Sequence, residues 1–202
     1  MNLISNDCVG GELYKAYDLQ YSNPFIWTVL PYKDFLKLFK DWDKINFEKV
    51  KYSETPNYLF SWYMSCLVID NKVNVYFPHH FKHEKYKEME LIHPISKQNG
   101  YAYCDMDKYL IETYNRRIER MKDSPVFIFS QENRNTEKEL EDLLKLAKKN
   151  GRKLIFISSN KNLIKKYIDC ENIKFLFKEK NEVSQKKQAD VIKNNLNDFI
   201  NN

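Results

Sequence analysis

A short polar loop near the start of the chain carries residue types suited to nucleophilic catalysis. The loop is Ser5-Asn6-Asp7-Cys8-Val9-Gly10-Gly11, and it follows Asn2–Ser5, which we predict to be a strand. A cysteine at the start of a helix is expected to have a lowered thiol pKa, which makes the thiolate available. We therefore predict that Cys8 is the nucleophile, that Asn6 is an oxyanion donor and that Asp7 orients a base.

The two adjacent glycines of this loop are informative because the chain contains only 4 glycines. Adjacent glycines permit positive φ and the close approach of a ligand. We predict that the Gly10 and Gly11 amides bind an oxyanion or another anionic group of the substrate. Ser5 is predicted to contact substrate or to act as an alternative nucleophile. The competing interpretation is an ordinary helix-capping turn in which Cys8 is a small buried residue.

The middle of the chain offers candidate bases for this nucleophile. Four histidines lie in one short segment: His79, His80, His83 and His93. Because imidazole titrates near neutral pH, we predict that His79 or His80 is the general base for Cys8. On a helix His79 and His83 would be spaced as two metal ligands, but an adjacent proline weighs against this, and we predict neither a metal ion nor a cofactor. An exposed histidine-rich loop is the remaining alternative.

Three arginines lie near the end of a predicted helix from Asp105 to about Lys122. Arg117 shares an apolar stripe with Leu110, Tyr114, Ile118 and Met121, so it is expected to face the core and to need an anionic or carbonyl partner. An internal ion pair with Asp7, Glu12 or Asp105 is the favoured interpretation. The alternative is substrate binding by Arg116, Arg117 and Arg120, which would clamp a phosphate of a nucleotide sugar, an undecaprenyl-linked glycan or coenzyme A.

The order of the elements predicts how these residues are positioned. After the first strand we expect a helix over Gly11–Tyr17, a second helix following Pro31 and a hairpin of Tyr63–Ile69 and Val73–Phe77. Strands and helices then alternate: Val126–Phe129, Thr136–Asn150, Leu154–Ser158, Asn162–Ile168, Ile173–Phe177 and Val183–Ile200. This alternation is typical of a parallel sheet with helices on both faces. We predict one α/β domain over residues 1–202, a three-layer sandwich with a mostly parallel sheet and an inserted hairpin. Sheets of this kind bind ligands at the carboxyl ends of their strands.

The composition argues against a nucleic-acid partner and against a membrane span. Hydrophobic residues make up 43% and charged residues 30%, which is ordinary for a folded protein. The net charge of +5 is spread along the chain without a basic cluster, so we predict no nucleic-acid partner. The four cysteines form no CxxC pair and no apolar run approaches the ~20 residues of a membrane span. We therefore expect a cytoplasmic protein with free thiols and no transmembrane segment. Its expected partner is a small-molecule or glycan substrate, and the sequence does not indicate an oligomeric state.

Two segments carry a resemblance to a known family. Ile4–Gly11, followed by Tyr14 and Tyr21–Phe25, resembles the start of a bacterial domain family of unknown function that is often labelled exopolysaccharide biosynthesis protein. That family opens with Ser-Asn-Asn-Cys-Trp-Gly-Gly, a helix and Ser-Pro-Phe; here Asp7 replaces the second Asn and Val9 the Trp. Tyr114–Met121, before the strand Val126–Phe129, resembles the family's Trp-Asn-Arg-Arg…Arg-Ile helix. In order of elements the resemblance covers about Met1–Ser158.

Related families have a similar layout. They are described as papain-like cysteine peptidases and as a capsule-biosynthesis group, and they contain a Phe-Pro-His-Asp-Phe-like segment, here Phe77–Phe81. The resemblance implies an enzyme of cell-surface polysaccharide biosynthesis that performs acyl or glycan transfer, or hydrolysis, with Cys8 and His79 or His80. The alternative is a non-catalytic module that binds a phosphorylated sugar or a biosynthetic partner.

Overall fold

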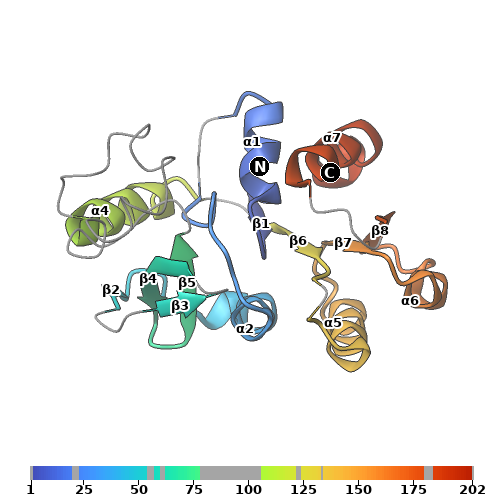
Figure 1. The fold of residues 1–202 in the computed structure, drawn as a ribbon, viewed down its shortest axis with the longest axis horizontal. Helices are drawn as coiled ribbons and strands as arrows, with labels where there is room; N and C mark the ends of the chain where they lie inside the picture. Colours follow the sequence, from blue (N-terminus) through green and yellow to red (C-terminus); the bar gives the residue numbers. More distant parts are fainter. Residues whose placement is uncertain are drawn as a thin grey trace.

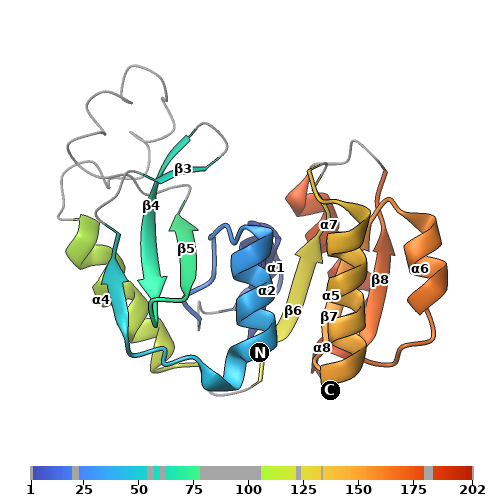
Figure 2. The ribbon, with the colours of Figure 1, turned by 90° about the horizontal axis from the view of Figure 1, so that it is seen from below.

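Four short apolar segments form a parallel sheet in the computed structural model. The structure describes residues 2–19, 23–53, 57–59, 62–77, 106–121, 124–132, 134–179 and 184–201. The strands are β1 (Leu3–Ser5), β6 (Val126–Ser130), β7 (Leu154–Ser158) and β8 (Ile173–Phe177), in the spatial order β1-β6-β7-β8. All three strand pairs are parallel, so the four carboxyl ends lie along the same edge of the sheet (Figures 1 and 2).

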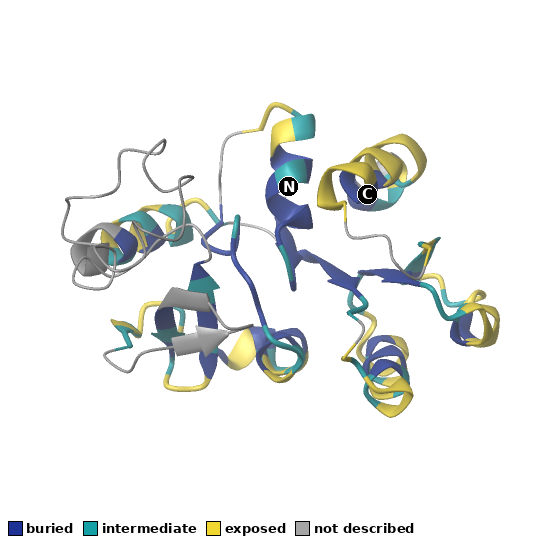
Figure 3. Ribbon diagram, viewed as in Figure 1, coloured by how far each residue is buried: buried dark blue, intermediate teal, exposed yellow. Residues whose placement is uncertain are grey.

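The two faces of this sheet bury different side chains because successive residues of a strand point to opposite faces. In β6, Phe127 and Phe129 join the core under helices α2 (Tyr32–Asp41) and α5 (Glu137–Asn150). Val126 and Ile128 instead join the core under α1 (Val9–Ala16) and α7 (Gln185–Asn195). Figure 3 shows the buried sheet between helices with exposed outer faces. The predicted three-layer α/β sandwich is confirmed.

Local signals place the ends of the helices. Thr136 and Glu139 form a capping box at the start of α5, and Gly151 ends the helix with a φ of 69°, a conformation that glycine adopts readily. Helix α6 (Lys161–Tyr167) joins β7 to β8. The single terminal helix predicted over Val183–Ile200 is wrong, because the chain breaks at Leu196 into α7 and α8 (Asn197–Asn201).

The predicted hairpin is confirmed, and it belongs to a second, antiparallel sheet. Its strands are β4 (Trp62–Ile69) and β5 (Val73–Phe77), and β4 also pairs with β2 (Val50–Tyr52) and β3 (Asn57–Leu59). Between the hairpin strands, Asp70 and Asn71 both have positive φ, which these residue types tolerate better than most. The 3-10 turn Trp42–Lys44 and helix α4 (Met106–Ile118) complete this part of the chain.

The short segment that follows the turn at residues 24–27 connects the two sheets. The backbone N–H of Leu30 donates to the carbonyl of Asn6 just beyond β1, at 3.0 Å. Its neighbour Val29 exchanges two backbone hydrogen bonds with Tyr76 of β5, at 2.8 and 3.1 Å. Val29 and Leu30 therefore link the end of β1 to β5. Among the described residues, no helix is both long enough and apolar enough to cross a membrane.

Candidate functional site

The predicted catalytic loop lies at the carboxyl edge of the parallel sheet, as expected. Ser5 ends β1, and Cys8 directly precedes α1. The Ser5 hydroxyl donates to Asp7 Oδ1 at 3.0 Å, and the Val9 N–H donates to the same oxygen at 3.0 Å. The Asp7 carboxylate thus binds an amide at the start of α1, which agrees with the alternative interpretation of the loop as a helix-starting turn.

The expectation of a lowered thiol pKa at Cys8 is wrong. The residue is 8% exposed, and burial raises its thiol pKa to about 12, with further contributions from the negative charges of Asp7 and Glu12. Burial penalises the thiolate, and the carboxylates on either side oppose a second negative charge at the helix start. Cys8 is therefore a protonated thiol at neutral pH.

Asp7 is half-buried and interacts electrostatically with Lys178, at the other end of the sheet. Burial raises the pKa of its carboxyl, while the hydrogen bonds from Val9 and Ser5 and the positive charge of Lys178 act in the opposite direction. Lys178 directly follows β8, so it belongs to the same carboxyl edge although it is distant in sequence. The predicted role of Asp7 in orienting a histidine base stays a prediction.

The two glycines make room for protein side chains. Both lie inside helix α1, so the expectation of positive φ at the pair is wrong. A Cβ atom on Gly11 would lie 2.4 Å from Cδ2 of the Trp27 indole, and one on Gly10 would lie 3.2 Å from Ser5 Cβ. We expected a ligand to lie close to these glycines; the groups that do so are Trp27, beside Gly11, and the end of β1, beside Gly10.

Asn6 joins two strands at their ends. Its Oδ1 accepts a hydrogen bond from the Ser130 N–H at 2.7 Å, and its Nδ2 donates to the Ser130 carbonyl at 3.0 Å. The side chain is 2% exposed. Asn6 therefore continues the pairing of β1 with β6 beyond the strand end. The structure gives it this structural role, and the predicted oxyanion role stays a prediction.

The histidine bases lie outside the described residues, so the pairing of Cys8 with His79 or His80 stays a prediction. Strand β5 ends at Phe77, immediately before this segment. Its arrowhead points in the same direction as those of β6 and β8 (Figure 2).

The three arginines lie elsewhere in the fold. Arg116 and Arg120 are exposed and Arg117 is half-buried, while Leu110 and Tyr114 of the predicted stripe are buried. Helix α4 packs beside the antiparallel sheet, and its last turn leads toward the amino end of β6, opposite the carboxyl edge (Figure 2). The end of α4 thus lies toward the amino end of the parallel sheet, whereas the Ser5–Gly11 loop lies at its carboxyl edge, and substrate binding by Arg116, Arg117 and Arg120 stays a prediction.

A polar cluster at the carboxyl edge was missed by the sequence analysis. Ser130 ends β6 and Ser158 ends β7, and both are buried. The Lys178 ammonium donates to Ser130 Oγ at 3.1 Å and to the Gln131 carbonyl. The Ser158 hydroxyl donates to the Gln131 side-chain oxygen. The sequence signal was a serine as the last residue of β1, β6 and β7, each after an apolar run.

A cavity of about 240 Å³ adjoins this cluster, between the ends of β7 and β8 and helix α7. Ile157, Leu176, Phe177 and Val191 supply its apolar lining. Lys178, Lys187 and Gln188 supply polar groups, together with the carboxylate of Glu179. This combination of apolar walls and a few polar groups is typical of small-molecule sites.

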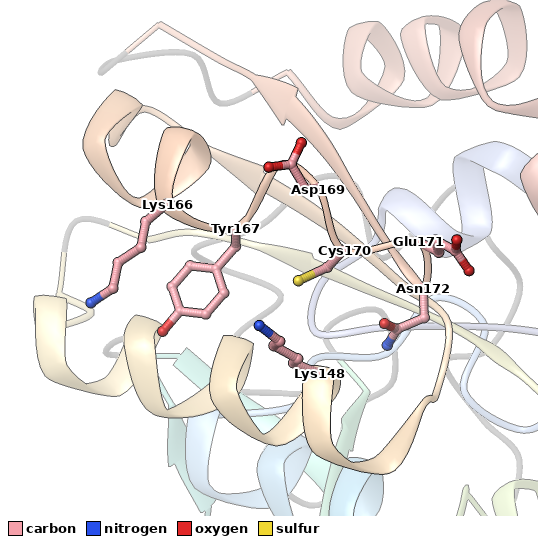
Figure 4. Close-up of a pocket in the computed structure, with 7 residues that line it drawn as sticks. All are labelled: Lys148, Lys166, Tyr167, Asp169, Cys170, Glu171 and Asn172. Carbon is pink, nitrogen blue, oxygen red and sulfur yellow. The ribbon is translucent and has the colours of Figure 1, made fainter.

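A second hollow, of about 350 Å³, lies at the opposite end of β8. Figure 4 shows Lys148 and Cys170 extending into the space between α5 and the loop before β8. Two of the polar side chains around it make bonds to the protein: Asn172 donates to the carbonyls of Ala147 and Arg152, and Lys166 pairs with Glu141. The Asn172 bonds hold the end of α5 against the loop, and the Lys166 pair joins α6 to α5, which gives this hollow a structural role.

Comparison with known proteins gives one family match. No curated protein matches the chain. The motif of the first loop and the segment Phe77–Phe81 fall inside the matched region, whereas the arginine helix falls outside it. The polar cluster after β6, β7 and β8 also lies beyond it. Residues 1–93 of the 202 are similar to the family described as Domain of unknown function (DUF1919).

Proposed function

We propose that the chain binds a small phosphorylated molecule at the carboxyl edge of its parallel sheet. The cavity between β8 and α7 carries this proposal, because it opens at the edge where parallel α/β sheets bind ligands and is lined by Lys178 and Lys187. Ammonium groups form strong, charge-assisted hydrogen bonds with phosphate oxygens.

A phosphorylated sugar is the first ligand to test. The first loop resembles families labelled exopolysaccharide biosynthesis protein, and sugar phosphates are the substrates that such a label suggests. Binding without covalent catalysis agrees with two features of that loop. The Cys8 thiol is buried with a pKa of about 12, and the Trp27 indole packs directly against Gly11.

Isothermal titration of the full chain with glucose 1-phosphate tests the proposal. We expect saturable binding that weakens as salt is added, because the contact is electrostatic. Lys187→Gln should weaken binding about 10-fold, the effect of losing one charge-assisted hydrogen bond worth roughly 1.5 kcal/mol. Lys186→Gln, an exposed neighbour on the same helix that does not line the cavity, is the matched control. Equal affinities for the two variants would contradict the proposal.

The second candidate is an enzyme of cell-surface polysaccharide biosynthesis that uses Cys8 as nucleophile. The observation that favours it is the position of Cys8, at the start of a helix and at the carboxyl edge of the sheet. With a thiol pKa of about 12 in the unliganded chain, this reaction requires a base or an accompanying change that releases the thiol proton.

Alkylation by iodoacetamide across pH, read by peptide mass spectrometry, tests the second candidate. A raised pKa keeps the thiol protonated, so we expect slow alkylation of Cys8 with no inflection below about pH 10. The half-buried Cys170 serves as an internal comparison in the same samples. An inflection at Cys8 near or below the ordinary thiol value of about 8.5 would support a nucleophilic role.

A further inference from the structure

The side-chain amide of Gln188 borders the cavity between β8 and α7. The side chain is 6% exposed, and it lines the cavity. Lys178 Nζ donates to Ser130 Oγ at 3.1 Å, so the Ser130 hydroxyl hydrogen is free to donate to Gln188 Oε1, also at 3.1 Å. Ser130 Oγ thus accepts a hydrogen bond from Lys178 and donates its own hydrogen to the amide oxygen of Gln188, and Nε2 is the other end of that amide.

The other end of that amide is a hydrogen-bond donor. Within the part of the chain that the structure describes, Gln188 Nε2 makes no hydrogen bond. An acceptor atom of a ligand in the cavity would accept a hydrogen bond from this donor.

The walls of the cavity favour a flat apolar group. Phe177 is 53% exposed and Val191 is 37% exposed, and they extend from β8 and α7 respectively. Large apolar side chains exposed inside a hollow are characteristic of ligand sites. The Lys161 ammonium lies 4.9 Å from the centroid of the Phe177 ring, so a positive charge already borders this aromatic surface.

We propose that this cavity binds a nucleoside phosphate whose base presents a carbonyl oxygen. The base packs against Phe177 and Val191, and Gln188 Nε2 donates to the carbonyl. The phosphate lies toward Lys178 and Lys187. This inference rests on the proposed binding of a phosphorylated molecule at this edge and adds the aromatic part of the ligand. A volume of about 240 Å³ is below the ~300 Å³ at the lower end of typical ligand sites, so it suits a mononucleotide better than a dinucleotide.

Titration with uridine monophosphate and with ribose 5-phosphate separates this inference from the broader proposal. The two ligands share a sugar and a phosphate, and uridine monophosphate adds the base. We expect it to bind at least 10-fold more tightly, the size of one stacking contact with an aromatic side chain. Equal affinities would overturn the inference and leave phosphate binding intact. Binding of neither ligand would overturn both.

Substitution of the apolar wall provides the second measurement. Phe177→Ala should weaken uridine monophosphate binding about 10-fold while the affinity for ribose 5-phosphate is unchanged. Ile168→Ala is the matched control, because Ile168 is 59% exposed and does not line the cavity. Both positions are exposed, so thermal unfolding should be unaffected in both variants. If Phe177→Ala and Ile168→Ala bind uridine monophosphate equally well, the base does not occupy this cavity.

Discussion

Gly10 and Gly11 are adjacent residues of α1, but the space beside them differs. A side chain would meet a closer neighbour at Gly11 than at Gly10. The space beside Gly11 is filled by the Trp27 ring, at 2.4 Å from the position of a Cβ atom. The nearest atom to a Cβ on Gly10 is Ser5 Cβ at 3.2 Å. Replacement of a helical glycine by alanine gains about 1 kcal/mol of helix propensity, so the outcome depends on whether the neighbour can move.

Gly11→Ala should therefore destabilise the fold. The added methyl group overlaps an indole ring packed over the helix, and overpacking of this kind costs about 1–3 kcal/mol. Gly10→Ala is the matched substitution and should change the free energy of unfolding by less than about 1 kcal/mol. Urea denaturation measures both variants. Equal stability of Gly11→Ala and the unmodified chain would show that Trp27 moves aside easily.

At the same scale, the chemistry of the first loop could be only partly predicted. Its place after the first strand followed from the apolar run before it and from the polar turn. The thiol pKa of Cys8 could not be predicted, because it depends on burial and on the charges of Asp7 and Glu12 in the folded chain. The helix start lowers a thiol pKa when the thiol is accessible, and burial has the larger effect here.

Asn6 shows how a single side chain can join two elements. It contacts the Ser130 N–H and carbonyl, while its own backbone carbonyl accepts from Leu30. Strands β1 and β6 pair over only a short register, from Leu3 with Val126 to Ser5 with Ile128. The side-chain bonds of Asn6 extend that pairing into the turn that precedes α1.

Asn6→Ala should weaken this junction. The substitution leaves the buried Ser130 N–H and carbonyl without those partners, which we expect to cost about 2–4 kcal/mol. Asn195→Ala, which removes an exposed side-chain bond to the Val191 carbonyl, is the control and should cost far less. Hydrogen exchange of the Ser130 amide provides a local readout. Unchanged protection of that amide in Asn6→Ala would show that the backbone of β1 and β6 suffices.

Element boundaries were predictable where the sequence carries local signals. Strands β7 and β8 were predicted at their observed bounds, because each is an apolar run closed by polar residues. Strands β2 and β3 were missed, since three-residue segments such as Val50–Tyr52 become strands only by pairing with β4. The polar cluster was missed for a related reason: Ser130, Lys178 and Gln188 meet only after β6, β8 and α7 have packed together.

For the whole molecule, the hydrophobic core is continuous across the two sheets. One cluster of buried side chains includes Val75 of β5, Phe39 of α2 and Phe127 of β6. The Phe39 and Phe127 rings lie 4.8 Å apart between centroids in an edge-to-face arrangement. Because α2 packs on β5 and also shares this core with the parallel sheet, loss of one sheet exposes apolar surface of the other.

The chain should therefore unfold in a single cooperative transition, as one domain over residues 1–202 would. Far-ultraviolet circular dichroism follows the helices, and tryptophan fluorescence includes the signal of Trp42, which is buried in the shared core. We expect both probes to give the same thermal midpoint. Val75→Ala removes buried volume from β5 at a cost of about 2 kcal/mol and should lower both midpoints equally. The control is Val191→Ala, on the exposed side of α7, which should leave both midpoints unchanged. Two separate transitions, or a Val75→Ala shift seen by one probe alone, would mean that the antiparallel sheet unfolds independently and that the chain holds two domains.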